Sequence, residues 1–322
     1  MPKLSPADAR AKFRAMTDGL ALPVVAAPMF IVSTPPLVKA ERAAGIIGAF
    51  PALNARPQDM LTGWLDDIED GDGAPFAVNQ IVHRSNDRLM ADMEVMVRHR
   101  VPLCITSLGA RPEVFEAAQS YGGLTFHDVI NDRFARKAVE KGADGLILVC
   151  AGAGGHAGTL SPFAFVSEVR RWFEGPILLS GSISTGAGVL AARAMGADAA
   201  YIGSALIATE EANASADYKR GVVEGHADDI VYTNYFSGVH GNYYKPSIAK
   251  SGMDPDDLPE ADPSKMDFKS GGDGDTKVWK DIWGMGQGIG SVEAVEPVAD
   301  VVARLTREYE AARDGLQGQR SG

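Results

Sequence analysis

The sequence predicts a (β/α)8 barrel, an α/β fold in which eight parallel strands alternate with helices. Eight short apolar runs recur along the chain, and each is followed by a stretch with helical spacing of its apolar residues. These units occupy about 210 residues, close to the roughly 250 residues of a typical barrel. No Gly-x-Gly-x-x-Gly pattern follows the first run, which disfavours the alternative, an open doubly wound sheet.

The elements are expected in strict alternation. Several of the expected helices begin with Pro and several end just before Gly, the residues that helices favour at these two positions. The expected strands are Val24–Met29, Gly45–Phe50, Phe76–Ile81, Leu103–Leu108, Leu124–Val129, Gly145–Cys150, Ile177–Ser182 and Ala199–Ser204. The expected helices are Pro35–Ala44, Pro57–Glu69, Asn86–Arg98, Pro112–Gln119, Asp132–Lys141, Pro162–Phe173, Gly186–Met195 and a short one after Ser204.

The alternation stops near residue 212, so we expect residues 1–212 to form the barrel. Residues 213–276 are rich in Asp, Gly, Ser, Asn and Tyr, and we expect a small, mostly helical lid inserted after strand eight. A disordered linker is the alternative, but aromatic residues such as Tyr235 and Phe236 favour packing. Residues 277–322 are expected to return to the barrel, with a helix over Val292–Ala312.

Composition limits the class of protein. The 322 residues are 45% hydrophobic and carry a net charge of −11, so a large core is expected and nucleic acid and anionic membranes are not expected as partners. Cys104 and Cys150 lie in apolar runs and predict no disulfide framework. The start has no signal-peptide pattern and no apolar run is long enough for a membrane span, which predicts a cytoplasmic protein. No residues have metal-ligand spacing, so no metal is expected.

A glycine-rich loop, Gly152–Gly158, directly follows the apolar run Leu146–Cys150 and carries one histidine, His156. Glycines allow a ligand to approach the backbone closely, and catalytic groups favour loops on rigid scaffolds. A tight turn with a solvated histidine is the alternative. We expect His156 to act chemically on a flat molecule packed against this loop.

Small residues follow the last two expected strands, at Gly181-Ser182 and Gly203-Ser204. Barrels commonly bind phosphate at these two strand ends, through backbone N–H groups at helix N-termini. Together with the amide side chains of Asn79 and Gln80 after strand three, this pattern favours FMN lying across the mouth of the barrel.

The chain resembles the nitronate monooxygenase family, formerly called 2-nitropropane dioxygenases, over nearly its whole length. The segments that carry the resemblance are Ala26–Met29, Pro75–Asn79, Ala153–Gly158, Leu179–Ser182, Gly196–Ser204 and Gly284–Gly288. The resemblance implies a barrel with a lid and one non-covalent FMN. It implies a catalytic role for His156, near the substrate α-carbon, and oxidation of alkyl nitronates with O2.

The resemblance also implies which residues contact FMN. These are Ala27, Pro28, Met29, Asn79, Gly155, Gly181, Ser182, Gly203, Ser204 and Gln287. Two departures stand out: Gly181-Ser182 replaces a Gly-Gly pair, and His127 stands at the end of strand five, where many relatives carry Lys. We expect His127 to replace that Lys beside the flavin; a hydrogen-bonded structural histidine is an equal alternative.

The same loop also resembles FMN-dependent enoyl-thioester reductases, acyl-CoA dehydrogenases and NADH-dependent quinone reductases. There His156 would exchange a proton beside a hydride transfer involving NAD(P)H. Lys245 in the aromatic lid stretch could then meet a thioester phosphate. The partner expected in either case is a small molecule, a nitronate or an acyl thioester, and a homodimer is left open.

Overall fold

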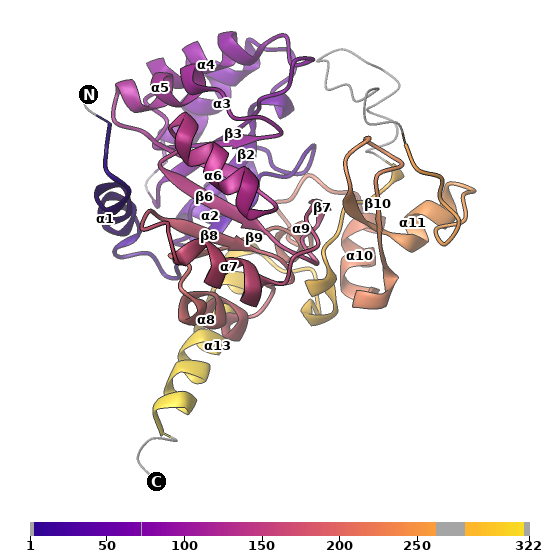
Figure 1. Ribbon diagram of the computed structural model, residues 1–322. Helices are drawn as coiled ribbons and strands as arrows, with labels where there is room; N and C mark the ends of the chain where they lie inside the picture. Colours follow the sequence, from indigo (N-terminus) through magenta and orange to yellow (C-terminus); the bar gives the residue numbers. More distant parts are fainter. Residues whose placement is uncertain (1–2, 72, 262–280, 319–322) are drawn as a thin grey trace.

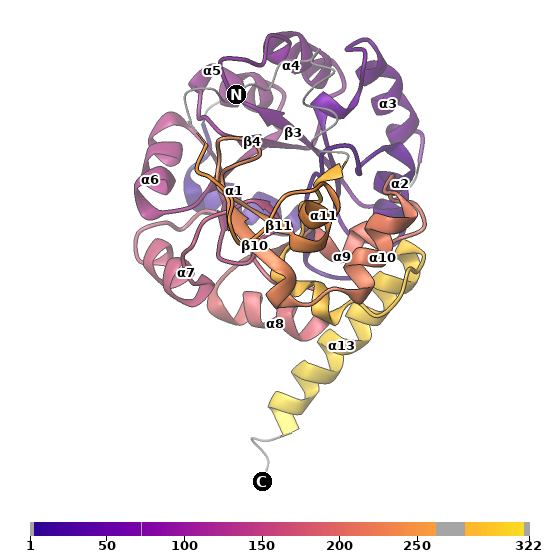
Figure 2. The ribbon, with the colours of Figure 1, turned by 90° about the vertical axis from the view of Figure 1, so that its right-hand side faces the viewer.

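The computed structural model describes residues 3–71, 73–261 and 281–318, and they form a closed parallel barrel. The eight-stranded sheet has the order β1-β9-β8-β6-β5-β4-β3-β2, and a bridge between Val25 and Ile47 joins its two edges. Helices surround the strands as a ring (Figure 2). The predicted fold class is therefore confirmed. The barrel strands are β1 (Val24–Ala26), β2 (Gly48–Pro51), β3 (Phe76–Ile81), β4 (Leu103–Ser107), β5 (Leu124–Val129), β6 (Gly145–Val149), β8 (Ile177–Ser180) and β9 (Ala199–Ile202).

The helices lie close to where the sequence places them. Two expected helices begin three residues later than predicted, because Pro57 and Asn86 lie in turns that precede them. The outer helices are α2 (Pro35–Ala43), α3 (Met60–Glu69), α4 (Leu89–Arg98), α5 (Pro112–Ser120), α6 (Asp132–Lys141), α7 (Pro162–Arg170), α8 (Gly186–Met195), α9 (Ser204–Ile207) and α13 (Val298–Gly318). The short 3-10 helices η1 (Ala52–Asn54) and η4 (Gln287–Ser291) lie in connecting loops.

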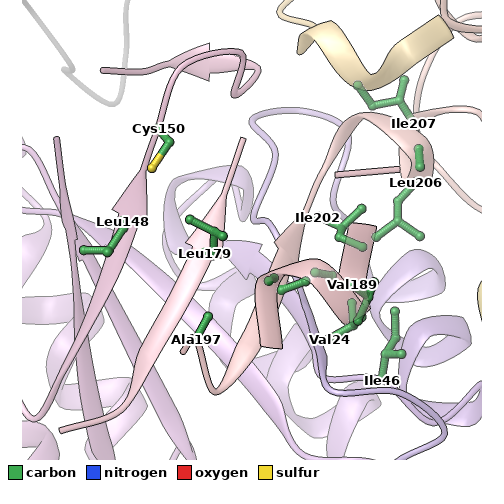
Figure 3. Close-up of a cluster of buried hydrophobic side chains, with 14 of the residues drawn as sticks. Val24, Ile46, Leu148, Cys150, Leu179, Val189, Ala197, Ile202, Leu206 and Ile207 are labelled. Atoms are coloured by element: carbon green, nitrogen blue, oxygen red, sulfur yellow. The ribbon is translucent and has the colours of Figure 1, made fainter. Parts of the chain in front are cut away.

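Side chains alternate between the two faces of each barrel strand. Inward-facing residues form a core inside the barrel, whereas outward-facing residues pack against the helices. Figure 3 shows part of the outer core, with Leu148 and Leu179 on neighbouring strands and Val189 of α8 nearby. Because this alternation is strict, the odd or even position of a residue along its strand, here called its parity, decides whether its side chain points toward the barrel axis.

A helix that the sequence analysis did not predict, α1 (Pro6–Thr17), covers the end of the barrel opposite the lid (Figure 1). Its Phe13 is fully buried, and the Phe13 and Phe126 ring centroids are 5.1 Å apart. Asp198 hydrogen-bonds Arg10 of this helix and Arg170 of α7. The opposite, carboxyl end of the strands is therefore the open one.

The segment after the barrel crosses this open end (Figures 1 and 2). Its described part contains α10 (Ala216–Glu224), η2 (Ala227–Asp229), α11 (Lys245–Lys250) and a hairpin of β10 (Ile230–Thr233) and β11 (Gly241–Tyr244). The expectation of a mostly helical lid missed this hairpin, although its Ile, Val, Thr and Tyr residues favour strands. Residues 262–276 of the expected lid and 277–280 of the C-terminal segment lie outside the described residues.

Candidate active site

A cavity of about 1140 Å³ opens at the carboxyl ends of the barrel strands. It is lined by the loops after β1, β4, β6, β8 and β9 and by parts of the lid segment. The structure brings eleven of the predicted site residues to this cavity: Ala27, Pro28, Met29, Asn79, His127, Gly155, His156, Gly181, Ser182, Gly203 and Ser204. Residues from five strand ends and from the glycine loop after β6 therefore converge, as the barrel topology requires.

One end of the cavity is built from small residues. Gly181 has φ +135°, and Ser182 adopts φ +55°, a left-handed conformation that is uncommon for a residue with a side chain. A Cβ atom on Gly152 would lie 2.0 Å from Ser182 Oγ, so the glycine loop and the loop after β8 approach too closely for any larger residue. Ser204 Oγ accepts a hydrogen bond of 2.8 Å from the N–H of Gly286. These residues fit an anionic phosphate group, because backbone and hydroxyl donors lie next to open space.

The glycine loop is held in place as a third strand of the lid sheet. Its residues Gly155–His156 form β7, which pairs antiparallel with β11, so that His156 lies opposite Gly241 and Gly155 opposite Asn242. The buried side chain of Asn242 donates a 2.6 Å hydrogen bond to the carbonyl of Ala153. The position of the catalytic candidate is therefore set jointly by the barrel and the lid.

His156 is half-buried at the edge of the cavity. Its Nε2 lies 2.9 Å from Ser237 Oγ, in the loop of the lid hairpin. Ser237 Oγ also lies 3.0 Å from the carbonyl of Val239, which accepts the hydroxyl proton. Burial lowers the pKa of His156 to about 4, so its imidazole is neutral at pH 7 and able to accept a proton.

The imidazole of His127 does not face the barrel axis. It lies on the outer face of β5, where its Nδ1 is 2.7 Å from Thr106 Oγ1 and its ring packs edge-on against Phe115 of α5. Burial, with a smaller contribution from the charge of Lys141, lowers its pKa to about 4. His127 also borders the cavity, and the inward position at this strand end belongs to the next residue, Asp128.

Asp128 was not singled out from the sequence, although strand parity could have found it. Leu124 and Phe126 are inward-facing apolar residues, so the next inward position on the same strand is Asp128. The carboxyl group borders the cavity, and burial raises its pKa to about 7. A titratable carboxyl in this position makes Asp128 a second candidate for proton chemistry.

Two other expected contacts are placed differently. The side chain of Gln287 is exposed and does not line the cavity, whereas its backbone N–H donates to the carbonyl of Gly152 and its neighbours Gly286 and Gly288 line the cavity. Lys245 forms an ion pair of 3.0 Å with Asp256 on the lid and does not line the cavity either. Both cysteines are free and buried.

Among residues 3–71, 73–261 and 281–318, no helix is both long and apolar enough to cross a membrane. The same residues contain no group of three or more His, Cys, Asp or Glu side chains arranged to hold a metal ion.

The chain is similar to several known proteins. Residues 77–308 match the family model of nitronate monooxygenase. A nitronate monooxygenase of Paraburkholderia phytofirmans is 26% identical, over 93% of this chain and 95% of its own length. A probable nitronate monooxygenase of Bacillus subtilis is also 26% identical, but the match spans 58% of this chain and only 56% of that protein.

Other similar proteins have different names. A 5-hydroxy-7a-methyl-1-oxo-octahydro-1H-indene-4-carboxyl-CoA dehydrogenase of Mycobacterium tuberculosis is 25% identical, over 69% of this chain and 62% of its own length. The solved structure of a nitroalkane oxidase from Streptomyces ansochromogenes superposes with a TM-score of 0.82 at 24% identity, covering 94% of this chain and 99% of that one. The last similarity supports the barrel fold. Because the family model covers most of the chain, this protein belongs to the nitronate monooxygenase family and is a flavin-dependent oxidoreductase.

Proposed function

We propose that the protein is an FMN-dependent nitronate monooxygenase that oxidises alkyl nitronates with O2. The observation that carries the proposal is the convergence, on one cavity, of the small-residue end at Gly181-Ser182 and Gly203-Ser204 with the neutral histidine His156. A phosphate at the first end and a substrate at the second would place a flat ring between them. The name of the Paraburkholderia relative supports the choice of substrate.

Different residues of the cavity would bind the phosphate of FMN, contact its ring system and accept a proton. Gly181, Ser182, Gly203 and Ser204 would hold the phosphate of FMN, while Ala27, Pro28, Met29, Asn79 and Gly155 would contact its ring system. Bound FMN supplies the redox chemistry by accepting electrons from the substrate. His156 would accept the α-carbon proton of a neutral nitroalkane, which converts the nitroalkane to the nitronate that is oxidised, and its neutral state leaves the lone pair available at pH 7.

The deciding experiment mixes the FMN-loaded protein anaerobically with a primary alkyl nitronate, NADH or NADPH and follows the visible flavin absorbance. The proposal expects rapid bleaching by the nitronate and reoxidation on admission of O2. Bleaching by NADH or NADPH with no nitronate turnover would reject the monooxygenase assignment. A protein that cannot be loaded with FMN would reject both this function and the alternative below.

A variant tests the role of His156 separately. The substitution His156→Asn should retain FMN and reduce turnover of a neutral nitroalkane by about 10²- to 10⁴-fold, the usual contribution of a general base. A matched control is His99→Asn, because His99 lies outside the cavity and contacts Glu69 on the protein surface. Unchanged turnover in His156→Asn would remove this residue from the mechanism.

One observation favours a second function, an FMN-dependent oxidoreductase of acyl thioesters that uses NAD(P)H. The cavity lining includes three cations, Arg111, Lys137 and Lys141, as well as the exposed apolar side chains of Ile130 and Phe134. Phosphates and an adenine or acyl group would suit such a mixed surface. The CoA thioester in the name of the Mycobacterium relative supports it, and the NADH and NADPH arms of the experiment distinguish the two functions.

A further inference from the structure

We propose that Asp128 is the proton-holding residue of this cavity, where its carboxyl group donates a hydrogen bond to the polar edge of the bound flavin in neutral solution and loses that proton in alkaline solution. The sequence patterns and the family resemblance assign Asp128 no role. The contact with flavin rests on the proposed function, whereas the protonation of the carboxyl group does not.

The position of Asp128 is set by the barrel. Its register partner on β6 is Ile147, which faces the barrel interior, and its side chain points the same way at the top of β5. Asn79 of β3, Ser107 of β4 and Tyr201 of β9 occupy comparable positions and line the same cavity. Asp128 therefore lies in a ring of polar side chains directly beneath the open end.

The hydrogen bonds around Asp128 have a defined direction. The side-chain amide of Asn79 donates to Ser107 Oγ over 2.6 Å, which leaves the Ser107 hydroxyl proton for the Asp128 carboxyl group. The second carboxyl oxygen, Oδ1, is buried and has no hydrogen-bond partner among the described protein atoms. Burying a charged carboxylate with one oxygen lacking a hydrogen bond costs free energy. A neutral carboxylic acid that donates a hydrogen bond to a bound ligand avoids that cost.

The charged groups around Asp128 do not stabilise a carboxylate. Within the described residues, Asp128 takes part in no ion pair. Tyr201 faces it from β9, and the negative charge of Asp128 helps to raise the pKa of that phenol. His156 on β7 and His127 on the outer face of β5 have pKa values of about 4, so neither is a cation at pH 7. Arg56, Arg111, Lys137 and Lys141 also line the cavity, but none of their charges is among the causes of the pKa shift of Asp128.

Desolvation is the largest influence on the pKa of Asp128. It raises the pKa to about 7, even though the hydrogen bond from Ser107 acts in the opposite direction. The carboxyl group is therefore partly protonated in neutral solution, and its protonated form can donate a hydrogen bond to a ligand. A protonated donor below the ring would strengthen flavin binding, and an ionised carboxylate would weaken it.

The test begins with the protein before FMN is added. Infrared difference spectra between pH 5 and pH 9 should show the carbonyl stretch of a protonated carboxylic acid that disappears with a midpoint near pH 7. The signal should be absent in Asp128→Asn and unchanged in Asp59→Asn, an exposed aspartate at the start of α3. Glu41 is a second buried carboxyl group with a raised pKa and can contribute a signal of its own, so the proposal is overturned if the signal near pH 7 is as large in Asp128→Asn as in the wild-type protein.

The second readout uses FMN without any substrate. The visible spectrum of bound FMN and its dissociation constant should both change with the same midpoint near pH 7, and Asp128→Asn should bind FMN with neither change. Ser107→Ala should move the midpoint upward, because it removes the hydrogen bond that favours the carboxylate. An unaltered flavin titration in Asp128→Asn would refute the contact with flavin.

The two readouts separate this proposal from the proposed function. Failure of the wild-type protein to bind FMN would reject the proposed function, while the infrared signal would still decide whether Asp128 holds a proton. Should Asp128→Asn fail to fold, the midpoint shift in Ser107→Ala decides the question, and no shift there would count against the proposal.

Discussion

The hydrogen bond from Asn242 to Ala153 ties the glycine loop to the lid, and its removal should loosen the loop that carries His156. The acceptor is a backbone carbonyl in a buried environment, and the donor side chain is only 3% exposed. Substitution Asn242→Ala therefore leaves a buried carbonyl unsatisfied, at a cost of about 1–3 kcal/mol. This energy corresponds to a change of about 5- to 150-fold in the population of the ordered loop.

Hydrogen exchange measured by mass spectrometry tests this directly. The backbone N–H of Ala157 donates to His240, so peptides that contain these residues report the pairing of β7 with β11. Exchange there should accelerate by about 5- to 150-fold in Asn242→Ala, provided that exchange occurs through local opening. The matched control is Asn234→Ala, which removes a similarly buried amide that binds Ala261 within the lid segment. Unchanged exchange in Asn242→Ala, or equal acceleration in both variants, would refute the reasoning.

Three further predictions concern other parts of the molecule. Gly152→Ala should weaken FMN binding at least tenfold in an equilibrium titration, because the added Cβ would overlap Ser182 Oγ and the φ of Gly152 is +79°. Unchanged affinity would show that the glycine loop does not contact the cofactor. Because the folded-state pKa of His127 is lowered to about 4, its contribution to stability is complete above pH 6.5 and is lost as the pH falls toward 4. In denaturant unfolding, the free energy of unfolding of His127→Gln should therefore fall less between pH 6.5 and pH 4 than that of the wild-type protein, by on the order of 3 kcal/mol. An equal fall in both proteins would contradict the lowered pKa of His127. Arg88→Met should lower the free energy of unfolding by about 3–5 kcal/mol, because it leaves Asp92 buried without its ion-pair partner, whereas the double variant with Asp92→Leu should recover much of the loss.

The barrel was predictable from the sequence because its strands are buried on both faces. Such strands are continuous apolar runs, and β3 and β5 begin and end at the predicted residues. Helix α1 was missed because its pattern precedes the first strand and belongs to no βα unit. The predicted ends of β8 and β9 were too long, since the small residues after them belong to the loops that line the cavity.

The candidate site was predictable where it depends on residue type and less so where it depends on parity. Small residues at strand ends and a histidine in a glycine loop are visible in the sequence, and they do converge. Choosing between His127 and Asp128 requires knowing which of the two neighbouring residues faces the barrel interior, and residue type alone favours the histidine. The pairing of β7 with β11 has no local signal, because Gly155 and His156 have no strand propensity of their own.

That pairing has a consequence for the order in which the protein can form. The barrel cannot close until β9 has been made, because β1 pairs with it across most of the barrel sequence. The glycine loop is synthesised much earlier than β11, so β7 can pair only after β11 has been made. The carbonyl of Gly152 accepts its hydrogen bond from the N–H of Gln287, which is synthesised later still. During synthesis from the N-terminus, the scaffold is thus completed before the reactive centre. A chain truncated after β9 would retain its barrel strands and His156 without the partners that align that histidine.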